Sequence, residues 1–222
     1  MVTSAARGAV RADGNVAGER TRARLISAGE RLFAKYGLDA VSVRDITAAA
    51  KANTAAVHYH FGSKRGLIEA ILEARATDVG RVRGQFLDRI EASPKPTLRD
   101  VVAALVIPTA ELAQDRRRGG YYYVGFLSAV LSHPEFMPAV NDAVDPHTSR
   151  YLASLEKVTS HLSPEVRALR HALAKDMVNR VFGQPAGAVH LWLQERAPGA
   201  EEHLVDRVID FLCGAFEAPQ TG

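Results

Sequence analysis

The sequence predicts an all-α protein made of a small N-terminal helix-turn-helix domain and a larger helical body. Apolar residues recur at spacings of three and four along most of the chain, which is the period of a helix buried on one face. Alanine, leucine and charged residues dominate, and no strand-like alternation of apolar and polar residues persists. Several short helical segments, each preceded by a capping residue, are crowded into residues 21–70.

Length and composition narrow the class of protein. A chain of 222 residues suffices for a small domain joined to a larger one. Its apolar runs are interrupted well short of the roughly 18 residues that a membrane span needs, and the N-terminus lacks the apolar core of a secretory signal. Cys213 is the single cysteine, which excludes an internal disulfide and suits a reducing compartment. We therefore expect a cytoplasmic protein that does not contact a membrane.

Positive charge is concentrated in the N-terminal third. Residues 1–75 contain 12 Lys/Arg and 7 Asp/Glu, whereas residues 76–222 contain 16 and 18. A basic segment on a nearly neutral remainder suits a domain that binds a polyanion and a body that binds something else. Ordinary solvated charge is the alternative, but the excess coincides with the helix-turn-helix segment, which favours the polyanion.

The N-terminal segment is expected to contain a flexible arm and then a first helix. Residues 1–17 are rich in Gly and Ala and are interpreted as the arm. The helix is predicted from about Arg20 to Tyr36, and Gly37 ends it in the left-handed conformation. Cations in the first turns act against the helix dipole, so the arginines there favour a bound anion: Arg20, Arg22 and Arg24.

Residues 41–60 predict the helix-turn-helix itself. Ser42 begins the second helix, with Asp45 three residues later as its capping-box partner. Asn53 is a good N-cap for a short third helix. Val57 faces the core, and several residues are left outside: Thr54, Ala55, His58 and Tyr59. An exposed aromatic pair on so short a helix needs a partner, and the major groove of DNA provides one.

The remainder is predicted to be helical throughout. A long amphipathic helix runs from Lys64 to about Ile90 and joins the two parts, and Pro108 is expected to kink the next helix. The later helices are expected at about 97–116, 119–132, 134–162 with a break near Asp145-Pro146, 164–196 with a break or kink at Pro185, and 201–217.

Residues 18–78 resemble the TetR family of bacterial transcriptional regulators. The matching pieces are Leu32-Phe33-Ala34-Lys35-Tyr36-Gly37, Val43-Arg44-Asp45-Ile46 and His58-Tyr59-His60-Phe61-Gly62-Ser63-Lys64. The resemblance implies a DNA-binding domain over 18–78, with its helix-turn-helix at 41–60, and a ligand-binding and dimerisation domain over 79–222. One departure is Lys51, at a turn position that the family usually fills with glycine. A left-handed lysine there costs on the order of 1 kcal/mol.

The resemblance also assigns roles in DNA binding. It implies phosphate contacts by His58, Tyr59 and Lys64, the last of which follows the N-cap Ser63. Base reading is assigned to small side chains whose methyl groups suit thymine, so DNA shape is expected to matter as well. The predicted DNA-binding residues are Arg44, Asn53, Thr54, Ala55, Ala56, His58, Tyr59, His60 and Lys64. His58 and His60 point in different directions on a helix, so no shared metal is expected.

The body offers candidate residues for a ligand pocket and a dimer interface. Aromatic residues at helical spacing are often plain core, but the resemblance implies a pocket, with candidate lining residues Tyr122, Phe126, Phe136, Met137 and Trp192. The last two helices have broad apolar faces that either cap the core or pair with a second copy. The resemblance favours pairing, and a two-fold dimer suits a palindromic operator. The predicted interface residues are Val181, Val189, Val205, Val208, Ile209, Leu212 and Phe216.

The sequence therefore predicts a homodimeric regulator, most simply a repressor that a small, largely apolar effector releases from a palindromic DNA operator. A regulator controlled by a protein partner, or by no ligand, is the alternative. A helical enzyme is a distant one, because no Gly-x-Ser-x-Gly, His-Glu-x-x-His, phosphate-binding glycine loop or metal-spaced Cys/His set is found. No cofactor or metal is expected. The sequence does not distinguish a repressor from an activator.

Overall fold

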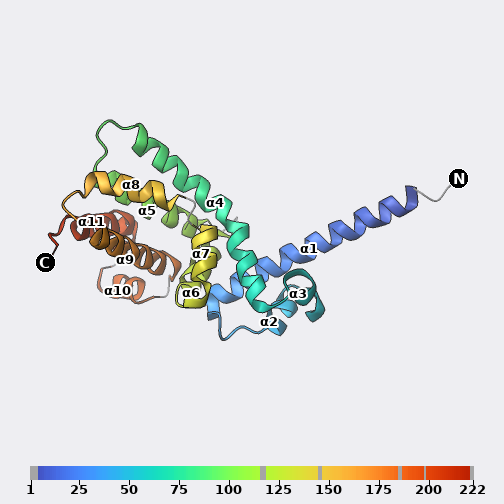
Figure 1. The fold of residues 1–222 in the computed structure, drawn as a ribbon. Helices are drawn as coiled ribbons and strands as arrows, with labels where there is room; N and C mark the ends of the chain where they lie inside the picture. Colours follow the sequence, from blue (N-terminus) through green and yellow to red (C-terminus); the bar gives the residue numbers. More distant parts are fainter. Residues whose placement is uncertain (1–4, 116–118, 145–146, 185–186, 198, 221–222) are drawn as a thin grey trace.

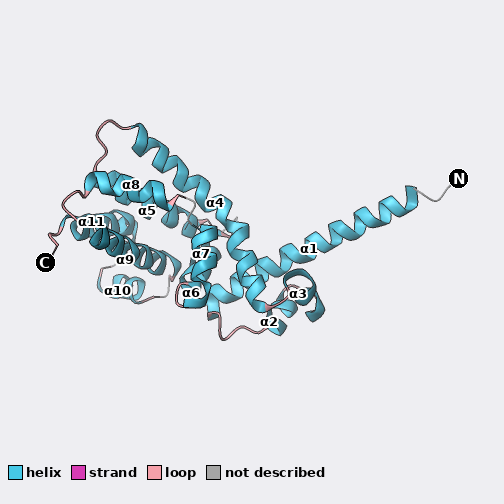
Figure 2. Ribbon diagram, in the orientation of Figure 1, coloured by secondary structure: helices cyan, strands magenta, loops and turns pink. Residues whose placement is uncertain are grey.

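The computed structural model describes residues 5–115, 119–144, 147–184, 187–197 and 199–220. Every regular element in these ranges is a helix (Figures 1 and 2), which confirms the predicted fold class. A small group of N-terminal helices, α1–α3 with the start of α4, forms what we call the reader. The body, which comprises the rest of α4 and the helices that follow, lies to its left in Figure 1. Within the described ranges no helix combines the length and apolarity needed to cross a membrane.

The reader consists of α1 (Ala5–Tyr36), α2 (Val43–Ala49) and α3 (Thr54–Phe61). Helix α1 begins earlier than expected and projects far from the rest of the molecule (Figure 1). Residues 5–17, which were interpreted from the sequence as part of a flexible arm, are helical in this structure. Extending an existing helix adds one hydrogen bond for each residue fixed, and this segment is rich in alanine and contains no proline that would stop it.

The predicted caps of the short reader helices are confirmed. The Ser42 hydroxyl accepts from the Asp45 amide at 3.2 Å, and the Asp45 carboxylate accepts from the Ser42 amide at 2.8 Å. The Asn53 side chain accepts from the Ala55 amide at 3.0 Å. Lys51 is left-handed, with φ 50°, so the turn that departs from the family pattern carries the expected strain. These local contacts fix where α2 and α3 begin.

The body is built from longer helices. They are α4 (Lys64–Ala92), α5 (Leu98–Gln114), α6 (Gly120–Val130), η1 (Pro134–Phe136), α7 (Met137–Val144), α8 (Thr148–Val158), α9 (Pro164–Gly183), α10 (Ala188–Arg196), η2 (Ala200–His203) and α11 (Leu204–Glu217). Pro108 lies within α5, which continues past it. The breaks expected at Asp145-Pro146 and at Pro185 lie outside the described residues.

The buried side chains form two clusters, and α6 and α7 belong to the cluster of the reader. Phe126 of α6 packs on Phe33 of α1, with ring centroids 6.1 Å apart. Gly125 of α6 lets the two helices come close, because a Cβ there would lie 3.2 Å from the Cβ of Ala34. The second cluster joins α5, α8, α9 and α11. Helix α6 is therefore the element of the body that is most directly attached to the reader.

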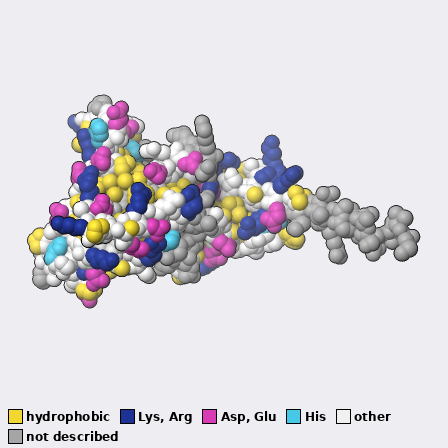
Figure 3. Space-filling model, turned by 90° about the horizontal axis from the view of Figure 1, so that it is seen from above, with side chains coloured by type: hydrophobic (Ala, Val, Ile, Leu, Met, Phe, Trp, Pro, Cys, Tyr) yellow, Lys and Arg dark blue, Asp and Glu magenta, His cyan; other side chains and the backbone are white. Residues whose placement is uncertain are grey.

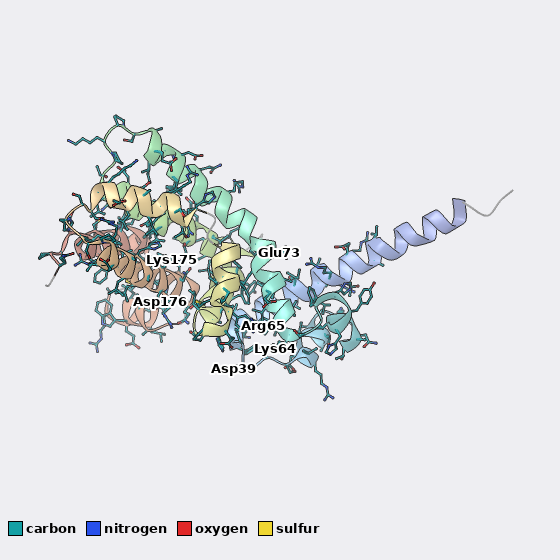
Figure 4. The ribbon with its side chains drawn as sticks, in the orientation of Figure 1. Asp39, Lys64, Arg65, Glu73, Lys175 and Asp176 are labelled. Atoms are coloured by element: carbon teal, nitrogen blue, oxygen red, sulfur yellow. The ribbon has the colours of Figure 1, made fainter. Side chains whose placement is uncertain are left out.

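Polar contacts reinforce this junction. Arg75 of α4 donates to both carboxylate oxygens of Glu30 of α1 at 3.0 Å, and Glu30 is buried. His133 lies 3.3 Å from the carboxylate of Asp39. Arg65 donates to the carbonyl of Glu135 at 3.2 Å; Figure 4 labels Asp39 and Arg65 in the part of the molecule where the reader meets the body. The pKa of His133 is raised by the hydrogen bond of its ring to the Ala129 carbonyl and by Asp39, so protonation strengthens this link.

Candidate DNA-binding surface and effector cavity

Helix α3 presents one face to the core and one to solvent, as predicted. Val57 is fully buried in the core of the reader, whereas 85% of the Tyr59 side chain is exposed. Thr54, Ala55 and His58 are exposed on the same outer side of the helix. A large aromatic ring left this exposed on a helix that is otherwise well packed is unusual for a structural residue. The outer face of α3 is therefore the candidate DNA-binding surface.

Contacts at both ends of α3 hold this face in place. Asn53 caps the first turn, and Gly62, with φ 73°, ends the helix. The His58 ring nitrogen Nδ1 lies 3.0 Å from the Gly62 carbonyl. The ring of His60 makes an edge contact with that of Tyr59, with centroids 4.9 Å apart. The two histidines thus have separate partners, and the orientation of Tyr59 is set by its neighbours before DNA binds.

The predicted cations differ in how they are placed. Arg44 of α2 is exposed, as is Lys51 in the turn before α3, and Figure 3 shows Lys and Arg side chains standing out from the reader. The Lys64 ammonium instead turns inward and donates to the Leu38 carbonyl at 2.5 Å. Since an ammonium has three N–H donors and Lys64 is only half-buried, a phosphate contact by Lys64 stays a prediction, but its first role is to hold α4 to the loop before α2.

The predicted pocket residues do not surround a common cavity. Phe126 and Phe136 are buried in the core shared with the reader, and Met137 packs against that core. Trp192 is 58% exposed on α10, and Tyr122 is 37% exposed on α6. In this structure some of these large side chains lie in the core and others face solvent, so a pocket that they share stays a prediction.

A small enclosed cavity lies instead between α4, α5, α6 and α9. Its volume is about 20 Å³, enough for one water molecule. The polar residues that line it are Arg83, Thr109, Tyr123, Lys175 and Asn179, and apolar side chains complete the wall. Sequence reasoning missed most of this set. The available signal was Arg83, a charged residue four positions before Leu87 on the buried stripe of α4.

A wider groove lies at the junction of reader and body. It has a volume of about 630 Å³ and is open to solvent. Its walls come from the end of α1, from α6 with the turn after it, and from the end of α9, and they include Tyr36, Ser128, His133 and Gln184. The Gln184 amide donates to the Ser128 hydroxyl at 3.1 Å, which ties the end of α9 to α6. A molecule in this groove would touch reader and body together.

Most of the predicted interface residues are buried in the protomer itself. Those that belong to its core are Val181, Val208, Ile209, Leu212 and Phe216. In the structure the four residues of α11 lie on the helix that packs against α5 and α9 of the same chain, so a contact of these residues with a second chain stays a prediction. Val205 is half-buried and Val189 is 43% exposed. The large apolar residues of α9–α11 that do face solvent are Leu169, Leu173, Val189, Leu191, Trp192 and Phe211.

Comparison with known proteins agrees with the geometry. Residues 25–71 match the family model for bacterial regulatory proteins of the tetR family. Residues 103–215 match that for the tetracyclin repressor-like C-terminal domain. The HTH-type transcriptional regulator AcrR of Shigella flexneri is 25% identical over 181 residues, 79% of each chain. The HTH-type transcriptional dual regulator CecR of the same organism is 36% identical over 84 residues, 36% of this chain and 37% of that protein.

Solved structures show the same fold. The fatty acid degradation regulator FadR from Bacillus halodurans has a TM-score of 0.58 at 16% identity, over 89% of this chain and 96% of that one. The multidrug binding protein EbrR, complexed with imidazole, has a TM-score of 0.55 at 18% identity, over 90% and 97%. The second family model alone spans just over half of the chain, and the protein therefore belongs to the TetR family of DNA-binding, non-enzymatic transcriptional regulators.

Proposed function

We propose that the protein is a homodimeric repressor that binds a palindromic operator through α3 and releases it when a small molecule enters the body. The observation that carries this proposal is the outer face of α3, where an 85% exposed Tyr59 stands beside small exposed residues on a rigidly capped helix. That combination suits a helix that enters a major groove, with the tyrosine at its phosphate edge and methyl groups near the bases.

Dimerisation is supported by the apolar residues that α9–α11 leave in solvent. Leu169 and Leu173, one turn apart on α9, are 59% and 61% exposed, and Phe211 of α11 is 65% exposed. Arg170 of α9 donates to the Ala215 carbonyl at 2.8 Å, so these two helices are fastened to each other. An isologous pairing of this surface would place two readers in the two-fold relation that a palindrome requires.

Control by a small molecule is supported by the way α6 connects the two parts. It contributes Tyr123 to the cavity wall and packs Phe126 on α1 of the reader. A molecule that widened the cavity would move α6 and, through it, the reader. Release follows if the molecule binds the conformation that cannot bind DNA more tightly than the one that can.

The experiment is selection of DNA from a random library by the full chain, followed by fluorescence anisotropy on the selected duplex. The expected product is an inverted repeat. Tyr59→Ala should weaken binding to selected and unrelated duplexes alike, by about tenfold, the equivalent of one hydrogen bond to a charged group. Thr54→Ala should instead relax the base preference at one position of each half-site.

The matched control is Tyr122→Ala, which truncates an exposed tyrosine of the body and should leave DNA affinity unchanged. Enrichment of no inverted repeat, or equal losses for Tyr59→Ala and Tyr122→Ala, would contradict the proposal.

A further inference from the structure

The interior of the body contains two phenol groups that have no partner. Tyr123 of α6 and Tyr151 of α8 are 1% and 2% exposed, and neither hydroxyl makes a hydrogen bond in the structure. Buried hydroxyls are nearly always paired, because leaving one unpaired opposes folding. Tyr123 lines the cavity between α4, α5, α6 and α9, whereas Tyr151 does not. The Tyr123 hydroxyl therefore indicates a site that a polar ligand completes.

The same region is positively charged. The charged residues that line the enclosed cavity are Arg83 of α4 and Lys175 of α9, and both are cations; Figure 4 places Lys175 on α9, within the body. Both residues also take part in other interactions of the protein, so they are held in position rather than loose. Burial raises the pKa of both tyrosines, more than the nearby charge of Arg83 lowers it. Both phenols therefore stay protonated and remain hydrogen-bond donors.

The rest of the cavity wall is apolar. Leu105, Leu112, Val124, Leu127 and Val178 face the same space. A ligand that fits must combine an anionic, hydrogen-bond-accepting end with an apolar remainder. A single negative charge suits an interior site better than a dianion such as phosphate, because the cost of removing charge from water rises steeply with charge.

We propose that the effector is an amphipathic monocarboxylate, whose carboxylate is held by Arg83 and Lys175 and accepts a hydrogen bond from Tyr123. This rests on the proposed function, and it changes the effector from the largely apolar molecule that the sequence suggested to an anion with an apolar tail. A polar anchor of this kind would set specificity, since an apolar molecule of the same shape would leave the Tyr123 phenol unpaired.

The size of the cavity explains how such a ligand would act. At about 20 Å³ it cannot hold even a small carboxylic acid, so the ligand must separate α6 from α5 and α9 in order to enter. Helix α6 is also packed on α1 through Phe126 and Gly125. The closed cavity thus belongs to one state of the body, and the ligand would stabilise a second state with the reader displaced.

The test is isothermal titration calorimetry of the full chain, without DNA, with two matched pairs of probes. These are octanoate against 1-octanol, and benzoate against benzyl alcohol. In at least one pair the carboxylate should bind the wild type at least ten times more tightly than the alcohol. Tyr123→Phe and Lys175→Met should each reduce that preference by about tenfold and leave the weak binding of the alcohol unchanged. The control is Tyr122→Phe, which removes an exposed hydroxyl from the neighbouring position and should preserve the preference.

Three outcomes would overturn the inference: an alcohol that binds as tightly as its acid, no binding of either acid up to about 1 mM, or a preference that survives in Tyr123→Phe. Operator binding is measured separately. If the selected operator is bound but is released by the alcohols and not by the acids, the proposed function stands and the inference fails. If the acids bind with the expected pattern and no operator is found, the proposed function fails and the anion site stands.

Discussion

The reader and the body satisfy their buried polar groups differently. In the reader, buried Glu30 is paired with Arg75, and the buried Thr47 hydroxyl donates to the Arg44 carbonyl at 3.1 Å. Within the described residues, the buried hydroxyls that lack a partner are those of Tyr123, Thr148 and Tyr151, and all three belong to the body. The buried polar groups of the reader named above thus have partners within the protein. The body, in contrast, retains buried hydroxyls that have none.

This difference corresponds to the two tasks of a regulator. A DNA-reading helix must hold its side chains within a fraction of an ångström of their working positions, and the caps at Ser42, Asn53 and Ser63 serve that purpose. A ligand-responsive body must have a second state of similar free energy. Unpaired buried groups raise the free energy of the closed state, which brings the open state within reach of a ligand.

The largest expected effect concerns the ion pair that joins the two regions. Glu30→Ala should lower the free energy of unfolding by about 3 kcal/mol, because it leaves the charge of Arg75 in a largely buried position without its carboxylate. Burial raises the pKa of Glu30 despite Arg75, so the pair is not strongly stabilising overall. Replacing both residues, as Glu30→Leu with Arg75→Met, should therefore be nearly neutral. Urea denaturation would measure both, and equal losses in the two variants would contradict this account of the junction.

The second effect tests whether the body alone carries dimerisation. Leu173→Glu combined with Phe211→Glu places two carboxylates on the exposed apolar surface of α9 and α11. The dimer should dissociate in analytical ultracentrifugation, and operator affinity should fall by about 100-fold, since linked binding to the two half-sites is lost. Tyr122→Glu, on the exposed side of α6, is the control that should remain dimeric. A double variant that still sediments as a dimer would place the interface elsewhere.

A smaller effect is expected at the one strained turn of the reader. Among the residues that the structure describes, Lys51, with φ 50°, is the only non-glycine residue in the left-handed region. Lys51→Gly should be about 1 kcal/mol more stable than Lys51→Ala, because both lose the charge but only glycine loses the strain. Thermal or urea unfolding of the two variants gives the comparison. If glycine brings no gain over alanine, the turn is relaxed and the reader has no strain to relieve.

The sequence predicted the reader better than the body because the contacts of the reader are local. A cap such as Ser42 with Asp45 is completed within three residues, and the opposite faces of Val57 and Tyr59 follow from the helical period. The inward turn of Lys64 was not predictable in this way, because its partner Leu38 lies 26 positions away. The sequence pattern shows that an apolar stripe is buried, but it does not show which surface covers that stripe.

Helix α11 illustrates that limit. Its apolar stripe, which includes Val208 and Leu212, predicted burial correctly, but burial in the same protomer and burial against a second copy give the same period. The residue that now marks the proposed interface is Phe211, which lies off the stripe and is 65% exposed. It also follows that deleting the last helix would open the core of the body, so that deletion cannot test dimerisation by itself.

The most direct test of the difference between the two regions is a set of hydroxyl deletions measured by urea denaturation. Tyr123→Phe and Tyr151→Phe remove unpaired hydroxyls from the body, and each should raise the free energy of unfolding by about 1 kcal/mol. Thr47→Val removes a paired hydroxyl from the reader and should lower it by a similar amount. Opposite signs are the result that the account predicts. Losses in all three variants would mean that the tyrosine hydroxyls are already satisfied, and the body would then be as complete as the reader.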